Sequence, residues 1–493
     1  YIDSHNSQID EMDWTGINMR GLAVFLAIIV VTPVFASAEQ NWPGEPVDNH
    51  VHMSWAAMSK EVNDWADANP EIVDLTSIGE SYLGKTLWVV RLSDWSSDTK
   101  PNGTAKEIIY IDGGHHGNEY LGTALAWLTA KWYINGWING NEDAVSVLQN
   151  SEVHITIMLN PDGNDFDTRH NQNLSTTVNP FDSEPVPTGI DLNRNYDHFW
   201  DNCSPSDPYA PGTGPFSEPE TLANSIYMNT EVPDADLYVT MHTGVWIILY
   251  PWGKWPEQPS DWELFHGIRD DVHAGISDIP IQNANQGLYP NCGTSRDYGY
   301  GVMGYPTFTF ETDDEQFVPG SFEDLNDRLD EELDVMKYLI ENIWYWRARL
   351  VLDEFNIDGD EVEFTVTNEG RASTRNATLQ YVDGDKVLWE SANFTANASS
   401  TTTISSDGFD HTGGKWRLSY QKRVIHSSQW VNESVNVGDY EPSFFAQTTQ
   451  TMIWALQAGI IPLVVIGFAF WWSREDKPLE MEEEIPLEAE LLD

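Results

Sequence analysis

Short apolar runs alternate with amphipathic stretches between residues 50 and 346. The apolar runs are rich in β-favouring residues and end in polar turns: KTLWVVRLSD, EIIYIDGG, VHITIMLNPDG, DLYVTMHTG and PTFTFET. Helical patterns such as NEYLGTALAWLTAKWYIN and SEPETLANSIYMNTE separate them. Apolar strands that alternate with helices predict an α/β domain over residues 50–346, with a mixed, mostly parallel sheet covered by helices on both faces.

The pattern changes after this region. EVEFTVTNEG, NATLQYVDGDKVLWE and KWRLSYQKRV alternate apolar and polar positions, and the dipeptides Asp358-Gly359 and Asp383-Gly384 supply turns. Alternation at every second position is typical of strands with one buried face. We therefore predict a small β-sandwich over residues 349–440.

The segment MRGLAVFLAIIVVTPVFASA near the N-terminus has a basic start, an apolar core and an A-x-A ending. These three features are typical of a secretory signal peptide. We expect residues 19–38 to be this signal and residues 1–18 to be an upstream extension. An uncleaved N-terminal anchor is the alternative interpretation.

A second apolar segment, MIWALQAGIIPLVVIGFAFWW, carries no charge. A helix of about 20 residues spans a hydrocarbon core of about 30 Å. Arg474 and Lys477 follow, as is typical of a cytoplasmic flank. We predict one transmembrane helix at residues 452–472 and an acidic cytoplasmic tail at residues 473–493, which places the protein at the cell membrane with its α/β domain outside. A buried core helix is the alternative.

The chain is strongly acidic. Asp and Glu outnumber Lys and Arg by 78 to 25, for a formal net charge of -53. A field of this sign repels the phosphate backbone of nucleic acids. We expect no nucleic-acid partner.

Titratable side chains follow several of the predicted strands. His115, His116 and Glu119 come after EIIYIDGG, His242 ends LYVTMH, and Glu311 ends PTFTFE. Ligands of open α/β sheets bind beyond the carboxyl ends of the strands, so these side chains are candidates for one site. Two histidines and a glutamate form a known catalytic zinc set. Hydrogen-bonded structural histidines are the alternative reading of the residues alone.

Six motifs then occur in one order along residues 50–346: GGHHGNE, NPDG, GIDLNRNYD, MHTG with LYPWG, LYPNCGTSRDYGYG, and TFTFET. This series resembles the zinc metallocarboxypeptidases of the carboxypeptidase A/B family. The resemblance implies a carboxypeptidase-like fold, one Zn²⁺ per chain, and hydrolysis of the C-terminal peptide bond of peptides or proteins with a free C-terminus.

Residue by residue, the resemblance places the zinc ligands at His116, Glu119 and His242. It makes Glu311 the general base that takes a proton from water and delivers it to the leaving amine. His115 is then a neighbour of the ligands, packed or hydrogen-bonded.

The resemblance also implies substrate-binding residues. Asn193 and Arg194 match the family's clamp for the terminal carboxylate, a role that suits the planar fork of an arginine. Arg169 resembles the arginine that polarises the scissile carbonyl and stabilises the oxyanion. The stretch between Arg169 and Asn193 carries an insertion relative to the family pattern.

Tyr289 matches the family's mobile tyrosine that closes over the substrate, with Tyr298 and Tyr300 as competing candidates. Seven positions after Tyr289, Arg296 occupies the position that meets the side chain of the substrate's terminal residue, just before Asp297. A guanidinium there favours a terminal Glu or Asp. Pairing of Arg296 with Asp297, which leaves a neutral pocket, is the alternative.

Cys203 and Cys292 are the two cysteines of the chain. An exported domain permits a disulfide between them, and we predict this bond as a tether for the loop that carries Tyr289.

The leading interpretation is a membrane-anchored extracellular zinc carboxypeptidase. The first alternative is a zinc amidase or carboxypeptidase that acts on cell-wall peptides or N-acyl amino acids. The second is a catalytically inactive surface-binding protein that uses its β-sandwich.

Overall fold

The computed structural model describes residues 46–47, 50–101, 104–177, 186–202, 210–312, 322–358, 361–423 and 430–437. The predicted upstream extension, signal peptide, transmembrane helix and cytoplasmic tail lie outside these residues and stay predictions. In the part of the chain that the structure describes, no helix is long and apolar enough to cross a membrane.

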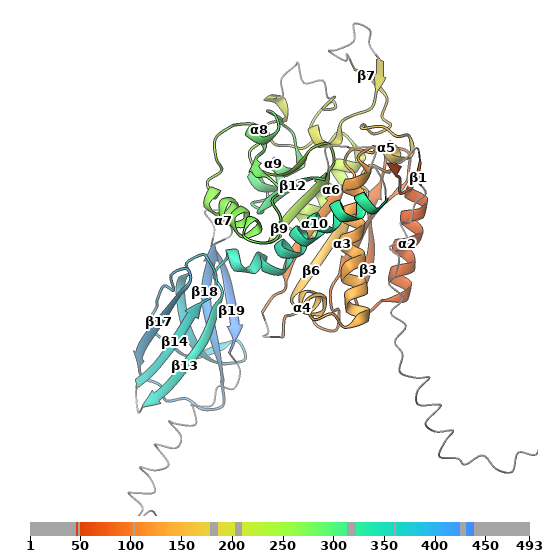
Figure 1. Cartoon of the computed structure of the whole chain (residues 1–493). Helices are drawn as coiled ribbons and strands as arrows, with labels where there is room; N and C mark the ends of the chain where they lie inside the picture. Colours follow the sequence, from red (N-terminus) through yellow and green to blue (C-terminus); the bar gives the residue numbers. More distant parts are fainter. Residues whose placement is uncertain are drawn as a thin grey trace, which may run out of the picture. The chain divides into compact units, whose positions relative to one another are not determined.

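An eight-stranded sheet forms the centre of the α/β domain (Figure 1). Its strands, in spatial order, are β11 (Ile281–Asn283), β10 (Trp246–Tyr250), β12 (Thr307–Thr312), β9 (Leu237–His242), β5 (Glu107–Gly113), β6 (Ser151–Thr156), β4 (Thr86–Leu92) and β3 (Val73–Glu80). The strands β12, β9, β5 and β6 are mutually parallel, and β11 is parallel to β10. The pairs β10–β12, β4–β6 and β3–β4 are antiparallel. The predicted mixed, mostly parallel sheet is confirmed.

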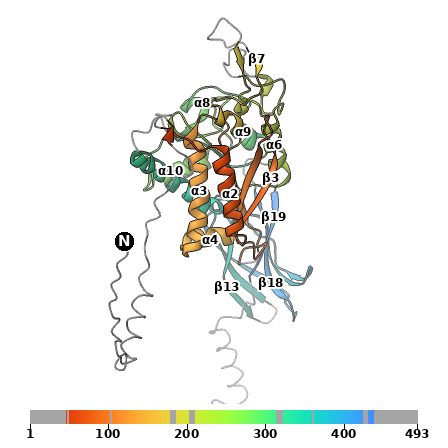
Figure 2. The same cartoon turned by 90° about the vertical axis from the view of Figure 1, so that its right-hand side faces the viewer.

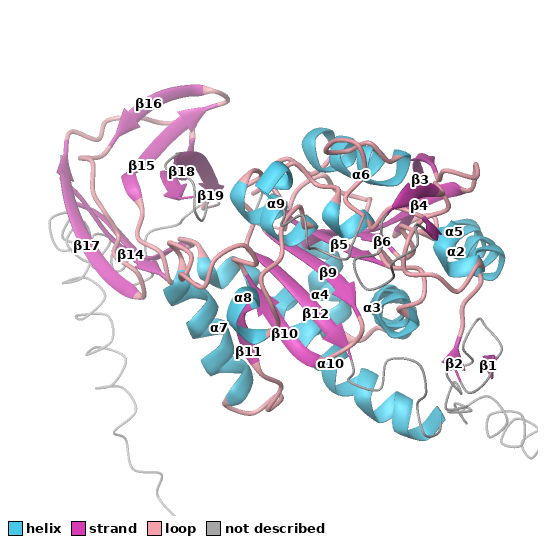
Figure 3. Cartoon of the chain, turned by 90° about the horizontal axis from the view of Figure 1, so that it is seen from above, coloured by secondary structure: helices cyan, strands magenta, loops and turns pink. Residues whose placement is uncertain are grey.

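Helices cover both faces of this sheet, as its sequence predicts. They are α2 (Trp55–Ala68), α3 (Tyr120–Asn139), α4 (Glu142–Asn150), α5 (Pro161–Asp165), α6 (Pro219–Thr230), α7 (Trp262–His273), α8 (Ala284–Gly287), α9 (Ser295–Gly301) and α10 (Phe322–Asn342). Figure 3 shows α6 and α9 on one side of the sheet and α3 and α10 on the other. Every residue of β9 is buried, which accounts for its mostly apolar sequence.

Short elements complete the domain. They are the strand pairs β1 (Pro46–Val47) with β2 (His50–Val51) and β7 (Ser175–Thr177) with β8 (Val186–Thr188), and the 3-10 turns η1 (Leu192–Arg194), η2 (Trp200–Asn202) and η3 (Ile343–Trp346).

The first half of the helix α3 is completely buried. Its side chains are buried on all faces from Tyr120 to Ala130, which is typical of a helix enclosed by other elements. It ends at Gly140, whose φ of 68° is the left-handed C-cap conformation that glycine adopts easily. Its neighbour α2 lies beside it (Figure 2), and Trp127 Nε1 donates to Glu61 Oε2 at 2.8 Å.

The predicted β-sandwich is present as two antiparallel sheets. One contains β13 (Leu350–Asp358), β14 (Glu361–Asn368) and β17 (Ser400–Asp407); the other contains β16 (Lys386–Glu390), β15 (Arg375–Asp383), β18 (Lys415–Arg423) and β19 (Trp430–Asn436). Alternate residues of β14 are buried, as the period of two predicts. Trp416 packs against Phe355, Tyr381 and Phe409 at ring-centroid distances of 4.5, 4.8 and 4.9 Å, so aromatic side chains fill the space between the sheets.

Gly122 marks the point where α3 meets β9 without room for a side chain. A Cβ atom there would lie 2.8 Å from the Met241 carbonyl oxygen and 2.9 Å from the His242 amide nitrogen. These are backbone atoms of a central strand, so they cannot move aside cheaply.

We expect Gly122→Ala to lower the free energy of unfolding by about 1–3 kcal/mol, the usual cost of overpacking a core. At an open helix position the same change stabilises by about 1 kcal/mol. Urea unfolding of the variant and the parent measures the difference. A variant as stable as the parent would contradict this close packing of α3 on β9.

Candidate metal centre and active site

Three side chains converge at the carboxyl ends of β5 and β9. The two strands are parallel neighbours, and His116 and Glu119 follow β5 while His242 ends β9. Their ligand atoms lie within 4.8 Å of one another, and all three residues are buried. His116 Nδ1 lies 2.7 Å from Glu119 Oε1, and His242 Nδ1 lies 2.9 Å from Glu119 Oε2.

The chemistry of this set fits a metal ion. The two Nδ1 atoms of His116 and His242 lie 3.2 Å apart, so both ring nitrogens face one point. Burial lowers the pKa of His242 to about 4, which keeps it neutral. Burial alone raises the pKa of Glu119, but the neighbouring His116 and His242 hold it below its usual value, so it is a carboxylate. Two nitrogens and one carboxylate are a catalytic zinc set.

A buried aspartate orients the first histidine. Asp191 Oδ1 lies 3.0 Å from His116 Nε2, so the Nε2 proton has an acceptor and Nδ1 is left for the metal. Burial opposes the charge of Asp191, but Arg169 and His116 hold its pKa well below the usual range. We did not predict Asp191. The one feature of the sequence that could have indicated Asp191 is its place two residues before Asn193 in the motif GIDLNRN.

His115 lies behind the metal centre. Its Nε2 lies 2.8 Å from the Tyr196 hydroxyl, and its ring stacks on His242 at 5.4 Å. Burial lowers the pKa of His115 well below its usual value, so it is neutral. It is a hydrogen-bonded neighbour of the ligands, as the sequence predicts.

Glu311 is the penultimate residue of β12 and lies beside His242. The two residues are paired in the parallel register of β12 and β9. The carboxyl group is enclosed, although the residue keeps some exposure toward the cavity. Burial, and then the like charge of Glu119, raise the pKa of Glu311 to about 8, against the opposing effect of nearby arginines. A carboxyl group with this pKa accepts and releases a proton near neutral pH.

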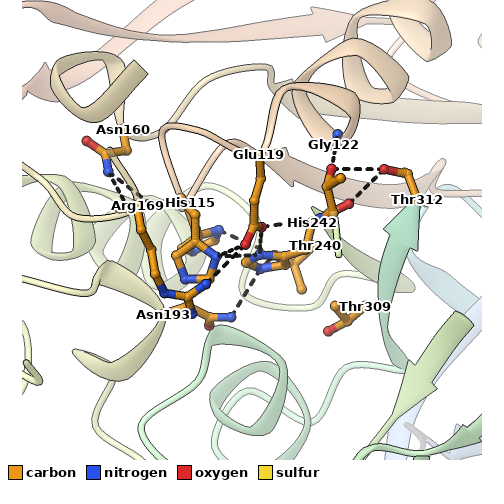
Figure 4. A network of polar contacts seen from close by, with 12 residues as sticks. His115, Glu119, Gly122, Asn160, Arg169, Asn193, Thr240, His242, Thr309 and Thr312 are labelled. Atoms are coloured by element: carbon orange, nitrogen blue, oxygen red, sulfur yellow. Dashed lines mark hydrogen bonds and ion pairs between the residues drawn. The ribbon is translucent and has the colours of Figure 1, made fainter. Parts of the chain in front are cut away.

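Two arginines and a tyrosine line the cavity with two of the metal-binding residues. Arg169 Nη1 donates to Glu119 Oε1 at 3.1 Å and its Nε donates to Asp191 Oδ2 at 2.9 Å; Figure 4 shows its side chain beside Glu119. Arg194 Nη2 donates to the Tyr289 hydroxyl at 3.1 Å. Tyr289 is 37% exposed, so its ring stands at the mouth.

Asn193 contacts both the helix α9 and the metal-binding histidine His242. Its Oδ1 accepts from the Ser295 amide at 2.9 Å, and its Nδ2 lies 3.1 Å from His242 Nε2. It therefore joins α9 to the metal centre.

Arg296 lies at the base of the same cavity and is 3% exposed. Its Nε donates to Asp297 Oδ1 at 3.1 Å, and its Nη2 donates to Asn291 Oδ1 at 2.8 Å. Asp297 also accepts from the Gly253 amide. The structure thus contains both features that the sequence posed as alternatives: Arg296 faces the cavity and pairs with Asp297.

One cavity brings together the predicted site residues other than His242, which contacts Glu119 from the end of β9. The cavity encloses about 180 Å³. Its lining contains His116, Glu119, Arg169, Asn193, Arg194, Tyr289, Arg296 and Glu311. The competing tyrosines do not line it: Tyr298 receives a hydrogen bond from Asn229, and Tyr300 packs on Trp252 and Phe265.

Cys292 is buried beside Asn291 and is disulfide-bonded. Cys203 lies outside the described residues, so its predicted pairing with Cys292 stays a prediction.

Comparison with known proteins gives consistent matches. The zinc carboxypeptidase family model matches residues 58–332. Carboxypeptidase B of Astacus astacus is 25% identical over 268 residues, 51% of this chain and 84% of that protein. Zinc carboxypeptidase A 1 of Drosophila melanogaster is 27% identical over 248 residues, 48% of this chain and 56% of that protein. The structure of bovine thrombin-activatable fibrinolysis inhibitor with a tick carboxypeptidase inhibitor is 22% identical, with a TM-score of 0.48 over 59% of this chain and 97% of that chain.

The family match spans the whole of the site. It begins before His116 and ends after Glu311, so it includes the metal-binding set and the residues that line the cavity. The chain therefore belongs to the zinc carboxypeptidase family and is a metallocarboxypeptidase.

Proposed function

We propose that this protein is exported and anchored to the cell membrane, where it removes the C-terminal residue of extracellular peptides or proteins and prefers acidic C-terminal residues. One observation carries the proposal: a single cavity is lined by two residues of a zinc-binding set, a carboxyl group with a raised pKa, and arginines that suit a carboxylate. An exopeptidase needs all three, because it must hold a free C-terminus beside the bond that it cleaves.

Zinc held by His116, Glu119 and His242 supplies Lewis acidity that polarises a carbonyl and makes water more acidic. Glu311 takes the proton from the attacking water and passes it to the leaving amine, because its carboxyl group lies beside the metal-binding set and lines the same cavity. Arg169 stabilises the negative charge that develops on the carbonyl oxygen.

The substrate is held by residues on the opposite wall. Arg194 and Asn193 bind the terminal carboxylate, and the Tyr289 hydroxyl, already within hydrogen-bond distance of Arg194, closes over it. The cavity is small and lined by fixed side chains, which favours one residue beyond the cleaved bond rather than a long chain.

Arg296 supports the preference for acidic termini. It is buried at the base of the cavity, where a contact is screened much less than on the surface. Asp297 offsets part of its charge and accepts from Nε, Asn291 Oδ1 accepts from Nη2, and Thr309 Oγ1 accepts from Nη1 at 3.4 Å. Each Nη group carries two N–H donors, so one donor on each is left for a substrate carboxylate.

Export and anchoring rest on the sequence patterns at residues 19–38 and 452–472. Digestion of a peptide library by the purified ectodomain, with and without a chelator, tests the proposal as a whole. Loss of single C-terminal residues that stops with the chelator supports it. Cleavage restricted to cell-wall peptides or N-acyl amino acids would favour the amidase alternative, and no cleavage at all would favour the inactive binding protein.

We expect Glu311→Gln to retain zinc but to lose turnover by about 10²–10⁴-fold, the usual contribution of a general base. His242→Ala is the contrasting variant: it removes a ligand and should lose the metal itself. Zinc content and kcat are measured for both proteins. A near-normal rate in Glu311→Gln would show that another group moves the proton.

We expect kcat/KM to be highest for peptides that end in Glu or Asp, compared with Leu or Lys. Arg296→Gln should reduce this preference by about 10- to 100-fold, since a hydrogen bond to a charged group contributes about 1.5–3 kcal/mol. Arg296→Lys is the control that keeps the charge and loses the planar fork. A parent enzyme that prefers Leu or Lys would contradict the role given to Arg296.

A further inference from the structure

Hydrogen bonds hold the Arg169 guanidinium in position, although Arg169 lies outside the helices and strands. It lies in the loop between α5 and β7. Its guanidinium nevertheless bridges Glu119 and Asp191, one a metal-binding residue and the other the partner of His116. A long side chain on a loop holds one position only if the loop backbone is held by its neighbours.

One side of this loop is held by the residues that precede α5. Asn160 Nδ2 lies 3.3 Å from the Arg169 carbonyl oxygen, and Figure 4 shows this contact. The Gly117 amide donates to the same oxygen at 3.3 Å. Both contacts are long, and the Thr168 amide adds a shorter one to the Gly163 carbonyl at 2.9 Å.

The other side is held by Asn171, which is fully buried two residues after Arg169. Its Nδ2 donates to Glu218 Oε2 at 2.9 Å and to Glu220 Oε2 at 3.2 Å. Its Oδ1 accepts from the Ile190 amide at 3.0 Å. A carboxamide satisfies this site because it offers donors to two carboxyl groups and an acceptor to an amide at the same time.

The two acceptors are fixed on α6. Glu218 is its N-cap residue and Glu220 lies in its first turn, and both are buried. Glu220 Oε1 accepts from the Tyr82 amide at 2.8 Å, and Glu218 Oε1 accepts from Ser217 Oγ at 2.8 Å. Asn171 therefore binds to groups that are already tied to the rigid part of the domain.

The contact with Ile190 links Asn171 to the other half of the site. The Asn171 amide donates to the Ile190 carbonyl at 3.0 Å, and Asp191 is the next residue. The chains are so close that a Cβ atom on Gly189 would lie 1.7 Å from the Asn171 carbonyl oxygen. One residue thus fixes the backbone beside Arg169 and the backbone beside its partner Asp191.

We propose that Asn171 is a positioning residue for catalysis: by joining Glu218, Glu220 and Ile190, it holds Arg169 where the guanidinium meets the charge that develops on the scissile carbonyl. This inference rests on the role proposed above for Arg169. Asn171 itself does not line the cavity and touches no reacting atom.

We expect Asn171→Ala to lower kcat about 10- to 100-fold with little change in KM, because a displacement of about 1 Å in a catalytic group costs up to about 10²-fold and acts only in the transition state. Asn173→Ala is a milder variant, since Asn173 is half-buried and donates to Glu218 Oε2 at 2.9 Å. Its loss of kcat should be smaller and of the same kind.

A double-mutant cycle with Arg169→Ala separates positioning from general destabilisation. If Asn171 acts through Arg169, Asn171→Ala should cost less than about 3-fold in kcat once Arg169 is absent, since residues that share one function are not additive. Equal costs in the two backgrounds would overturn the proposal. An Arg169→Ala variant with nearly normal kcat would instead overturn the role of Arg169 itself.

Asn368→Ala is the matched control in the β-sandwich. Asn368 is also fully buried; its Nδ2 donates to the carbonyl groups of Ala372, Ala396 and Asn397, and its Oδ1 accepts from the Arg349 and Gly370 amides. Its loss should lower stability without changing kcat. Zinc content is measured in every variant, and loss of zinc from Asn171→Ala or Asn173→Ala would contradict an effect exerted through Arg169 alone.

Discussion

The parallel pairing of β5 with β9 is the constraint on which the rest of the site depends. It brings His116 and Glu119, which follow one strand, beside His242, which ends the other. The next parallel pairing sets Glu311 opposite His242. A shift of one residue in either register would turn these side chains to the other face of the sheet. Backbone hydrogen bonds, rather than contacts of the ligands themselves, therefore bring the metal-binding set and the proton acceptor together.

Local ion pairs set the electrostatics of the cavity in a chain of formal charge -53. Arg169, Arg194 and Arg296 line one small cavity, and Arg169 lies between the carboxylates of Glu119 and Asp191. Surface charges are screened over about 10 Å at 0.1 M salt, whereas enclosed pairs are screened much less. An acidic protein can therefore offer a cavity that is locally suited to carboxylates.

Sequence reasoning found the residues that follow strands and missed those that support them. His116 and Glu119 stand at a strand end in a motif, and so they could be predicted. Asp191 lies 75 positions from His116, and no local pattern signals the hydrogen bond between them. Asn171 could not be predicted for the same reason, because its acceptors Glu218 and Glu220 lie at the start of α6, far from it along the chain.

The sequence by itself determined the alternation of strands and helices and the β-sandwich pattern, because hydrophobic periodicity follows burial. The residues alone left structural histidines as an alternative to a metal site, and the resemblance of six motifs to the zinc metallocarboxypeptidases implied the metal-binding residues. Tertiary structure alone decided how side chains pair. It placed Arg296 in the cavity and in contact with both Asp297 and Asn291, where the sequence had offered as alternatives a guanidinium that meets the terminal residue or a pair with Asp297 in a neutral pocket. The physical reason is that the direction of a side chain depends on segments packed against it, and these lie far apart along the chain.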